Sequence, residues 1–230
     1  MNYRYKFDPE RCYFKGTDKG CSCTQETGCP DFALMDYLMA TSGLPASKQQ
    51  RMEIFPDAVD EKSYQRLQNI GVGIRKFTTE GQDLYIYGAN TGSGKTTWAI
   101  KLLHAHFVSV YKYSAFKTQG IFIHVPSFLA RLKSSFRTQD AELEQIISLL
   151  STVGVVVWDD IASTSMTDFD SATLLTYIDQ RVINEKTNIY TGNLAYPDIK
   201  DALGERLCSR VWNKSVKVEL KGVDRRLPEW

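Results

Sequence analysis

A glycine-rich stretch containing a lysine, GANTGSGKTT, occupies residues 88–97 of the chain. Glycine, four residues of any kind and then Gly-Lys-Ser/Thr is the pattern of a loop whose backbone N–H groups cradle phosphate oxygens. Gly-Lys-Thr at 94–96 supplies the second half of this pattern, but the first glycine position holds Ala89, and the nearest glycine is Gly88, one residue earlier. We interpret the stretch as a lengthened phosphate loop, in which Ala89 makes no essential phosphate contact.

The surroundings of this loop favour a nucleotide site. An apolar run that reads as a strand precedes it, and a segment with apolar residues at helical spacing follows it. Lys95 is expected to bridge the β- and γ-phosphates, and the Thr96 hydroxyl to bind Mg²⁺. The alternative is a glycine-rich turn that happens to precede a helix. The residues expected to hold ATP are Gly88, Asn90, Thr91, Gly92, Ser93, Gly94, Lys95, Thr96 and Thr97.

Two adjacent carboxylates follow a second apolar run. Residues 155–158 read as a buried strand, and Asp159 and Asp160 stand at its end. Asp159 can hold Mg²⁺, and Asp160 can orient or deprotonate the attacking water. Asp160 reaches about 1.5 Å less far than the glutamate common at such positions. We therefore expect slow hydrolysis, since a misplaced water lowers the rate. The alternative is an aspartate pair that caps the next helix.

Three polar side chains further along could complete the site. Asn193 ends an apolar run, where its amide could hold the water or the γ-phosphate, or could simply belong to a turn. Arg206 and Arg210 are four residues apart and would share one face of a helix. An arginine presented in this way can reach the γ-phosphate of a neighbouring subunit. On composition alone, two solvated arginines are the simpler interpretation.

Short apolar runs separated by amphipathic segments predict the fold class. Strands that alternate with helices favour an α/β fold with a central parallel sheet covered by helices. Before the first run, segments 31–42 and 57–77 have helical patterns and look like a connecting arm. The runs expected to form strands are 84–88, 120–125, 153–160, 188–193 and 215–220.

Length and charge limit the possible classes of protein. A chain of 230 residues can hold one main domain and a small module. With 28 basic and 27 acidic residues, any contact with nucleic acid requires a local patch. No apolar run long enough to span a membrane is present, so a cytosolic protein is expected. We predict a cysteine-rich module at 1–44, a helical linker at 45–80 and an ATPase domain at 81–230.

Four of the five cysteines fall within the first thirty residues, namely Cys12, Cys21, Cys23 and Cys29. In a reducing compartment such a cluster favours metal binding over disulfides. Four thiolates can bind Zn²⁺ and so stabilise a segment with no core of its own. The successive cysteines are separated by eight, one and five residues. Zinc ligand pairs usually keep two to four residues between them, so thiols without metal and an iron–sulfur cluster stay open.

A basic helix is predicted at 126–137, where PSFLARLKSSFR combines cations with two phenylalanines. Bases that stack on an aromatic ring beside cations are held without sequence reading. The alternative is a solvated helix whose phenylalanine and leucine side chains pack inward. The candidate DNA-binding residues are Arg131, Lys133, Phe136 and Arg137, whereas the three histidines, His104, His106 and His124, are expected to be structural.

In this order, the motifs resemble those of the AAA+ ATPases that load replicative helicases in bacteria and phages, the DnaC/DnaI type. The resemblance spans roughly 83–230 and rests on GANTGSGKTTWA, VVVWDDIA, TGN, LGERLCSRV and VELKGVDRR. It implies that Lys95 and Thr96 are Walker A residues and that Asp159 and Asp160 are Walker B residues. It also implies that Asn193 is sensor 1 and that Arg210 is the arginine finger, with Arg206 beside it.

The resemblance also implies cofactors and partners. These are ATP, Mg²⁺, self-association through the arginine finger, single-stranded DNA and a hexameric DnaB-type helicase. The cysteine module would grip the helicase in the bacterial cytoplasm, with the protein encoded by a bacterium or a phage. Hydrolysis would act as a timer, and no helical lid domain is expected. Two alternatives remain, namely a transposition helper ATPase of the insertion-sequence type and a nucleotide-dependent binding adaptor without meaningful turnover.

Overall fold

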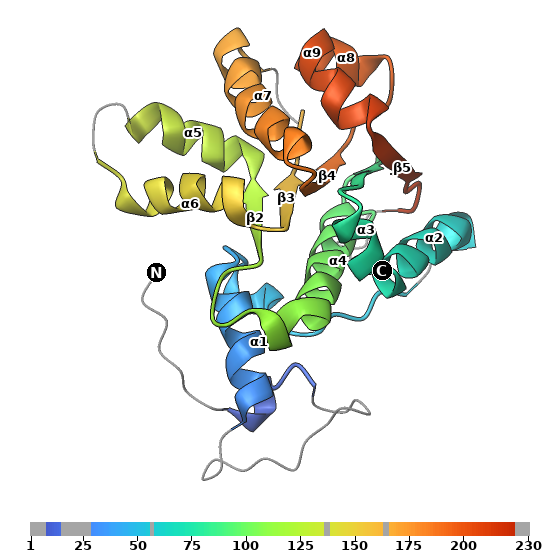
Figure 1. Ribbon diagram of the computed structural model, residues 1–230. Coiled ribbons are helices and arrows are strands. Elements are labelled where there is room, and N and C mark those ends of the chain that lie inside the picture. Colours follow the sequence, from blue (N-terminus) through green and yellow to red (C-terminus); the bar gives the residue numbers. More distant parts are fainter. Residues whose placement is uncertain (1–7, 15–28, 56–57, 136–138, 163–165, 224–230) are drawn as a thin grey trace.

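A computed structural model of the chain describes residues 8–14, 29–55, 58–135, 139–162 and 166–223. Within these residues, five parallel strands form one sheet in the order β2-β3-β4-β1-β5, with helices on both faces (Figure 1). The predicted α/β fold with a central parallel sheet is therefore confirmed. The strands are β1 (Asp83–Tyr87), β2 (Gly120–His124), β3 (Val155–Asp159), β4 (Thr187–Gly192) and β5 (Ser215–Glu219).

The helices alternate with the strands along most of the chain. The predicted helical segment 57–77 contains two helices, α2 and α3, which are separated by Gly73. The α-helices are α1 (Pro30–Thr41), α2 (Glu61–Val72), α3 (Ile74–Thr79), α4 (Lys95–Val110), α5 (Val125–Ser135), α6 (Ala141–Thr152), α7 (Asp168–Ile183), α8 (Asp198–Leu203) and α9 (Glu205–Cys208). Short turns are η1 (Pro9–Arg11), η2 (Ala46–Lys48), η3 (Ala58–Asp60), η4 (Tyr111–Tyr113) and the π-helical η5 (Ser209–Asn213).

Side chains that alternate along the strands divide the core into two layers. In β3, Val155 and Val157 pack with α1 to α4, whereas Val156 and Trp158 pack with α5 to α9. Because both faces are covered, every residue of β3 is buried. Burial of both faces explains why the sequence of β3 is a continuous apolar run.

The segments expected to form a connecting arm pack against the sheet instead. Helices α1, α2 and α3 share the first core layer with α4, and Phe14 from the N-terminal region lies in the same layer. The carbonyl of Ser42 accepts a hydrogen bond of 2.7 Å from Phe122 N, which covers part of the edge strand β2. The predicted boundaries at 1–44, 45–80 and 81–230 remain untested, but the helices of the linker belong to the core of the sheet.

A buried arginine ties together the elements at the amino-terminal edge of the sheet. Arg181 of α7 is 1% exposed and spans from the end of α6 to the beginning of β4. It also lies near Asp83, whose carboxylate accepts hydrogen bonds from the backbone and side chain of Asn188. The Arg181 guanidinium donates to Leu150 O, Val153 O, Gly154 O, Thr187 O and Asn188 Oδ1.

No helix among the described residues is both long and apolar enough to cross a membrane.

Candidate functional site

A cleft of about 690 Å³ opens at the carboxyl ends of the strands, where ligands of open α/β sheets bind. The loop after β1, the ends of β3 and β4 and the segment 48–55 line this cleft. Ten predicted site residues lie together here, namely Thr91, Gly92, Ser93, Gly94, Lys95, Thr96, Thr97, Asp159, Asp160 and Asn193. Lys48, Glu53, Ile54, Phe55, Ile100, His124 and Thr191 complete the lining.

The loop has the backbone conformation that exposes its N–H groups to an anion. Gly92 and Gly94 have φ angles of 70° and 96°, in the left-handed region that side chains other than glycine rarely adopt. Lys95 begins α4, and its ammonium donates to Gly88 O at 2.9 Å and Asn90 O at 2.7 Å. The positive end of the helix and the lysine therefore lie on the same side of the loop, as an anion site requires.

Gly88, between β1 and the loop, allows close packing against the backbone that follows β5. A Cβ atom on Gly88 would lie 1.9 Å from Leu220 O, because the backbone after β5 crosses this position. The Asn90 side chain donates to Lys221 O at 2.9 Å and Gly222 O at 3.2 Å, outside the cleft lining. Gly88 and the Asn90 side chain therefore lie outside the cleft lining, and their expected contact with ATP remains untested. They attach the lengthened loop to the segment after β5.

Substitutions at two adjacent positions test this register. Gly88→Ala should destabilise the fold by roughly 1–3 kcal/mol or more, because the new methyl group overlaps a backbone carbonyl. Ala89→Gly should leave ATP affinity unchanged, since the Ala89 side chain is exposed and lies outside the cleft lining. Chemical denaturation measures the first effect and titration with Mg-ATP the second. A large change in affinity for Ala89→Gly would show that the loop register is wrong.

Three oxygen-bearing side chains converge beneath the loop. The Thr96 hydroxyl donates to Asp159 Oδ1 at 2.8 Å, and the Thr191 hydroxyl donates to the same oxygen at 2.7 Å. Burial raises the pKa of the Asp159 carboxyl above its usual value, and the hydrogen bonds from Thr191 and Thr96 oppose that rise. Hydroxyl and carboxylate oxygens are the ligands that Mg²⁺ prefers. Thr96 and Asp159 therefore fit the predicted magnesium site.

Asp160 occupies a strained position beside the magnesium candidates. Its φ of 63° is unusual for a residue other than glycine, and its N–H donates to Thr191 Oγ1 at 2.9 Å. The carboxylate lies 4.0 Å from His124 Nε2, at the end of β2. Sequence reasoning missed both Thr191 and His124. Their only signal was their position at strand ends, while His104 and His106 are buried, as expected for structural histidines.

Comparison with known proteins shows what the chain is similar to. No protein-family model matches the chain. Over 164 residues, the chain is 26% identical to the replicative helicase loader DnaI of Bacillus subtilis (strain 168). The match covers 66% of this chain and 50% of the relative, so the chain spans about half the length of the curated protein that it matches.

Solved structures share the fold at lower identity. The crystal structure of the DnaC helicase loader has a TM-score of 0.59 at 20% identity, covering 74% of this chain and 94% of that one. Domain III of the Thermotoga maritima replication initiation protein DnaA has a TM-score of 0.57 at 16% identity, and the match covers 83% of this chain and 69% of that one. A crystal structure of DnaI has a TM-score of 0.55 at 16% identity, and the match covers 84% of this chain and 92% of that one. The resemblance to the DnaC/DnaI type is confirmed. The shared fold places the Walker A and Walker B candidates in the lining of one cleft.

The two arginine-finger candidates are separated by a change of helix type. Arg206 lies on α9, but Arg210 lies in the π-helical η5, whose wider turn removes the common face expected of an α-helix. Arg206 is exposed, and the Arg210 guanidinium forms an ion pair with Asp179 of α7. In the single chain, then, Asp179 holds Arg210, and Arg206 is the more accessible of the two candidates.

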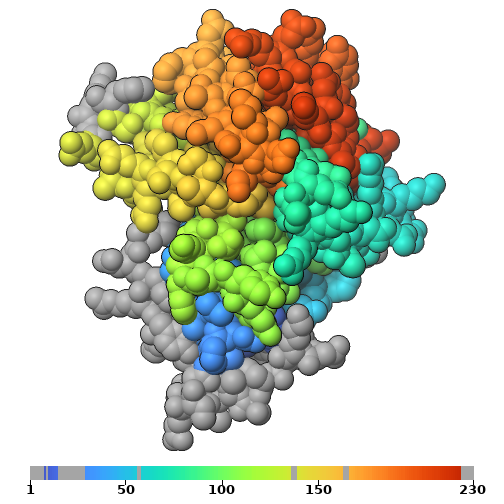
Figure 2. All heavy atoms as spheres, in the orientation of Figure 1, coloured from blue at the N-terminus to red at the C-terminus, as the bar shows by residue number. Residues whose placement is uncertain are grey.

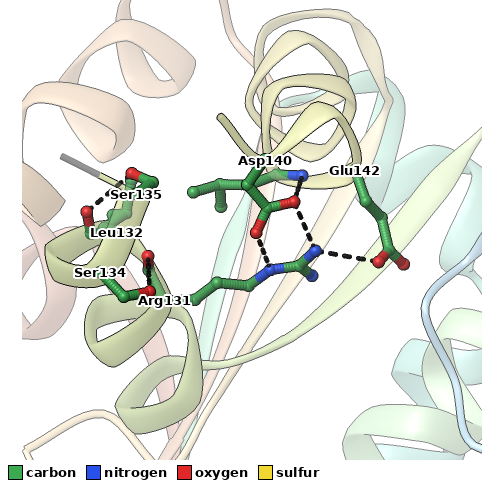
Figure 3. A network of polar contacts seen from close by, with 7 residues as sticks. Arg131, Leu132, Ser134, Ser135, Asp140 and Glu142 are labelled. Carbon is green, nitrogen blue, oxygen red and sulfur yellow. Dashed lines mark hydrogen bonds and ion pairs between the residues drawn. The ribbon is translucent and has the colours of Figure 1, made fainter. Parts of the chain in front are cut away.

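Two cations of the basic helix predicted to bind DNA are paired with acidic side chains. Arg131 of α5 donates to both oxygens of Asp140, at 2.5 and 2.7 Å, and to Glu142 at 2.9 Å (Figure 3). Lys133 forms an ion pair of 2.8 Å with Asp170. Hydrogen bonds to Asp140 and Glu142 raise the pKa of Arg131, and the Asp140 pKa is lowered in turn. Arg131 and Lys133 therefore form ion pairs within the chain. Phe136 and Arg137 lie outside the described residues.

The cysteine cluster is only partly described. Cys29 precedes α1 and accepts a hydrogen bond of 3.4 Å from Phe32 N, and Cys12 lies against the same core layer. Cys21 and Cys23 lie outside the described residues. Within the described ranges, no three histidine, cysteine or acidic side chains form a metal-binding group. Zinc binding by the four cysteines thus remains a prediction.

Proposed function

We propose that this chain is an ATPase that loads a hexameric DnaB-type replicative helicase onto single-stranded DNA, with slow hydrolysis as the release switch. The observation that carries the proposal is the contact between Thr96 and Asp159 beneath the loop that holds Lys95. It brings a metal-binding hydroxyl and carboxylate together beside a phosphate-binding lysine. The 26% identity to a replicative helicase loader supports the loading role.

The cleft residues fit Mg-ATP in three parts. Lys95 and the N–H groups of 92–95 would bind the phosphates, and Thr96 and Asp159 would hold the metal. Bound Mg²⁺ would neutralise charge on the phosphates. Ile54 and Phe55 line the cleft from the segment before α2 and offer apolar surface to the base. Asp160 and Asn193 would position the water.

Binding to a helicase tests the loading role directly. The full chain and its Lys95→Ala variant should be incubated with a purified DnaB-type helicase, with and without Mg-ATP. We expect the helicase to bind and to be deposited on circular single-stranded DNA by the unmodified chain, with Mg-ATP changing its retention. The Lys95→Ala variant should show no response to Mg-ATP. Absence of helicase binding under all conditions would refute the loading role and leave the ATPase proposal standing.

Asp160 separates a hydrolysing switch from a nucleotide-dependent adaptor. Asp160→Asn should lower ATP turnover on the order of 100-fold, because the water loses its oriented carboxylate, while ATP affinity changes little. Asp160→Glu should raise turnover, since the longer side chain restores the reach of a glutamate. Single-turnover hydrolysis and equilibrium binding of Mg-ATP separate the two effects. Equal turnover in all three proteins would favour the adaptor.

Self-association tests the arginine candidates. Because Asp179 holds Arg210 in the single chain, Asp179→Asn should release Arg210 and increase Mg-ATP-dependent oligomers if Arg210 acts between subunits. Arg206→Ala should abolish these oligomers if Arg206 is the finger. Sedimentation velocity with Mg-ATP distinguishes the two assignments. Oligomers that persist in an Arg206→Ala/Arg210→Ala double variant would contradict both.

Metal content tests the cysteine module. The purified chain should contain one Zn²⁺ per molecule, and replacing Cys12 with serine should remove it. In our proposal this module grips the helicase, so loss of zinc should weaken helicase binding while leaving ATP turnover intact.

A further inference from the structure

The turn after α4 exposes two aromatic side chains. Tyr113 is 75% exposed, the highest value for an aromatic residue in the described part of the chain, and Phe116 is 50% exposed. Tyr113 faces α3, through Arg75, and Phe116 contacts Tyr37 of α1 edge-on. Figure 2 shows the end of α4 and the turn as a green patch between α3 (teal) and α1 (blue). Exposed apolar surface rimmed by polar residues can mark a binding site.

The backbone of the turn that carries Phe116 is strained. Lys117 N donates to Ser114 O at 2.8 Å, which closes a turn with Ala115 and Phe116 at its centre. Their φ angles of 47° and 55° are both positive, a combination normally supplied by Asn-Gly. Holding a bulky residue in this region costs energy. Such strain persists where a function uses the conformation, so it motivates a search for a ligand.

Three cations lie near the rings, and within the described part of the chain none of them has an acidic partner. The Arg75 guanidinium carbon lies 5.5 Å from the centre of the Tyr113 ring, and Lys112 and Lys117 are exposed on either side. Among the described residues, no carboxylate forms an ion pair with these three cations. This contrasts with α5, where Arg131 and Lys133 are both paired. The positive charge of the turn therefore stays available to a polyanion.

We propose that this turn surface, formed by Arg75, Lys112, Tyr113, Phe116 and Lys117, binds single-stranded nucleic acid without reading its sequence. Bases would stack on the Tyr113 and Phe116 rings, and the cations would contact phosphates. Tyr113 and Phe116 are three positions apart in the sequence, so their Cα atoms are at most about 11 Å apart, within the span of a few nucleotides. A protein partner is less suited, because the cations would need a matching acidic surface that a phosphate chain supplies by itself.

The inference deepens the proposed function by locating its DNA contact away from α5. It does not depend on ATP, because the turn surface lies outside the nucleotide cleft. Binding should therefore persist in Lys95→Ala, which lacks the phosphate lysine. Failure of the loading role and failure of this surface then give different results.

Fluorescence anisotropy with a labelled oligothymidylate longer than about 16 nucleotides measures the contact. With the full chain and no nucleotide, Tyr113→Ala should weaken binding roughly 5- to 150-fold, whereas Tyr113→Phe should keep the affinity because it keeps the ring. Lys112→Ala/Lys117→Ala should lower the salt dependence of binding by about 1.4 in log–log slope. Lys62→Ala, an exposed lysine of α2, is the matched control and should change neither quantity.

Phe116→Gly separates binding from folding. Glycine tolerates the positive φ, so the melting temperature should stay or rise while oligonucleotide affinity falls. Equal affinity of Tyr113→Ala and the unmodified chain, or no binding by the unmodified chain, would overturn the proposal. Loss of helicase binding with unchanged oligonucleotide binding would also overturn it and assign the surface to a protein partner.

Discussion

Replacing Lys95 with alanine should lower ATP turnover on the order of 100- to 1,000-fold and abolish the stabilisation of the fold by Mg-ATP. The Lys95 ammonium is the cation that the structure places inside the phosphate loop, at 2.9 Å from Gly88 O and 2.7 Å from Asn90 O. Without it, the loop keeps its N–H groups but loses the charge that faces the phosphates. At a nucleotide concentration 100 times the dissociation constant, Mg-ATP should stabilise the unmodified chain by about 2.7 kcal/mol.

Thermal unfolding with and without Mg-ATP provides the measurement. Lys101→Ala, on the same helix but outside the cleft lining, should show the full shift in melting temperature and is the matched control. A Lys95→Ala variant that is still stabilised by Mg-ATP would show that the nucleotide binds elsewhere. The reading of the loop as a phosphate site would then be wrong.

Replacing the buried Arg181 with methionine should destabilise the fold by about 3–5 kcal/mol at neutral pH. Methionine fills similar volume but removes the Arg181 donor from four backbone carbonyls and from the Asn188 side chain. Gly154 O and Asn188 Oδ1 keep a second donor, in Thr187 N and Trp158 Nε1. Chemical denaturation measures the change. Arg206→Met, on the exposed face of α9, should change the free energy of unfolding by less than about 0.5 kcal/mol.

The pH dependence distinguishes the lost charge from a packing defect. Burial raises the pKa of Asp83 to about 6, and the Arg181 charge opposes that rise. The folded value lies above that of the unfolded chain, about 4, so the stabilising contribution of protonated Asp83 is lost as the pH rises through about 6. Removing Arg181 raises the Asp83 pKa further. The destabilisation by Arg181→Met should therefore be larger at pH 7 than at pH 5, whereas a packing defect alone would give equal values.

The sequence predicts those parts of the site that depend on local spacing. Gly-Lys-Thr at 94–96 and the acids after 155–158 are each fixed by one strand end, so their convergence follows once the strands are parallel. The fold class follows from the alternation of apolar runs and helical segments, although α6 was not anticipated. Ser42 on the edge of β2 and the packing of α1 to α3 on the sheet depend on contacts distant in sequence, which periodicity does not encode.

Distant charge partners explain what the sequence does not show about three cations. Arg131, Lys133 and Arg210 looked like solvated or ligand-binding cations because their acids lie 9, 37 and 31 residues away in the sequence. Thr191 was missed because a threonine within an apolar run reads as a strand residue, and only the register of β4 beside β3 places it against Asp159. The turn surface was hidden for a related reason, since Arg75 meets Tyr113 only after α3 packs on α4.

The phosphate loop of a newly made chain cannot be attached to the segment after β5 until that segment has been translated. The partners of the Asn90 amide are translated 131 and 132 residues after it, and Leu220 arrives in the same interval. At ribosomal speeds of about 5–20 residues per second, the unfinished loop waits roughly 7–26 s. During that time β1 lacks its β5 neighbour. We expect ATP capture to be postponed until the last strand of the sheet is in place, so that a truncated translation product lacks the finished loop.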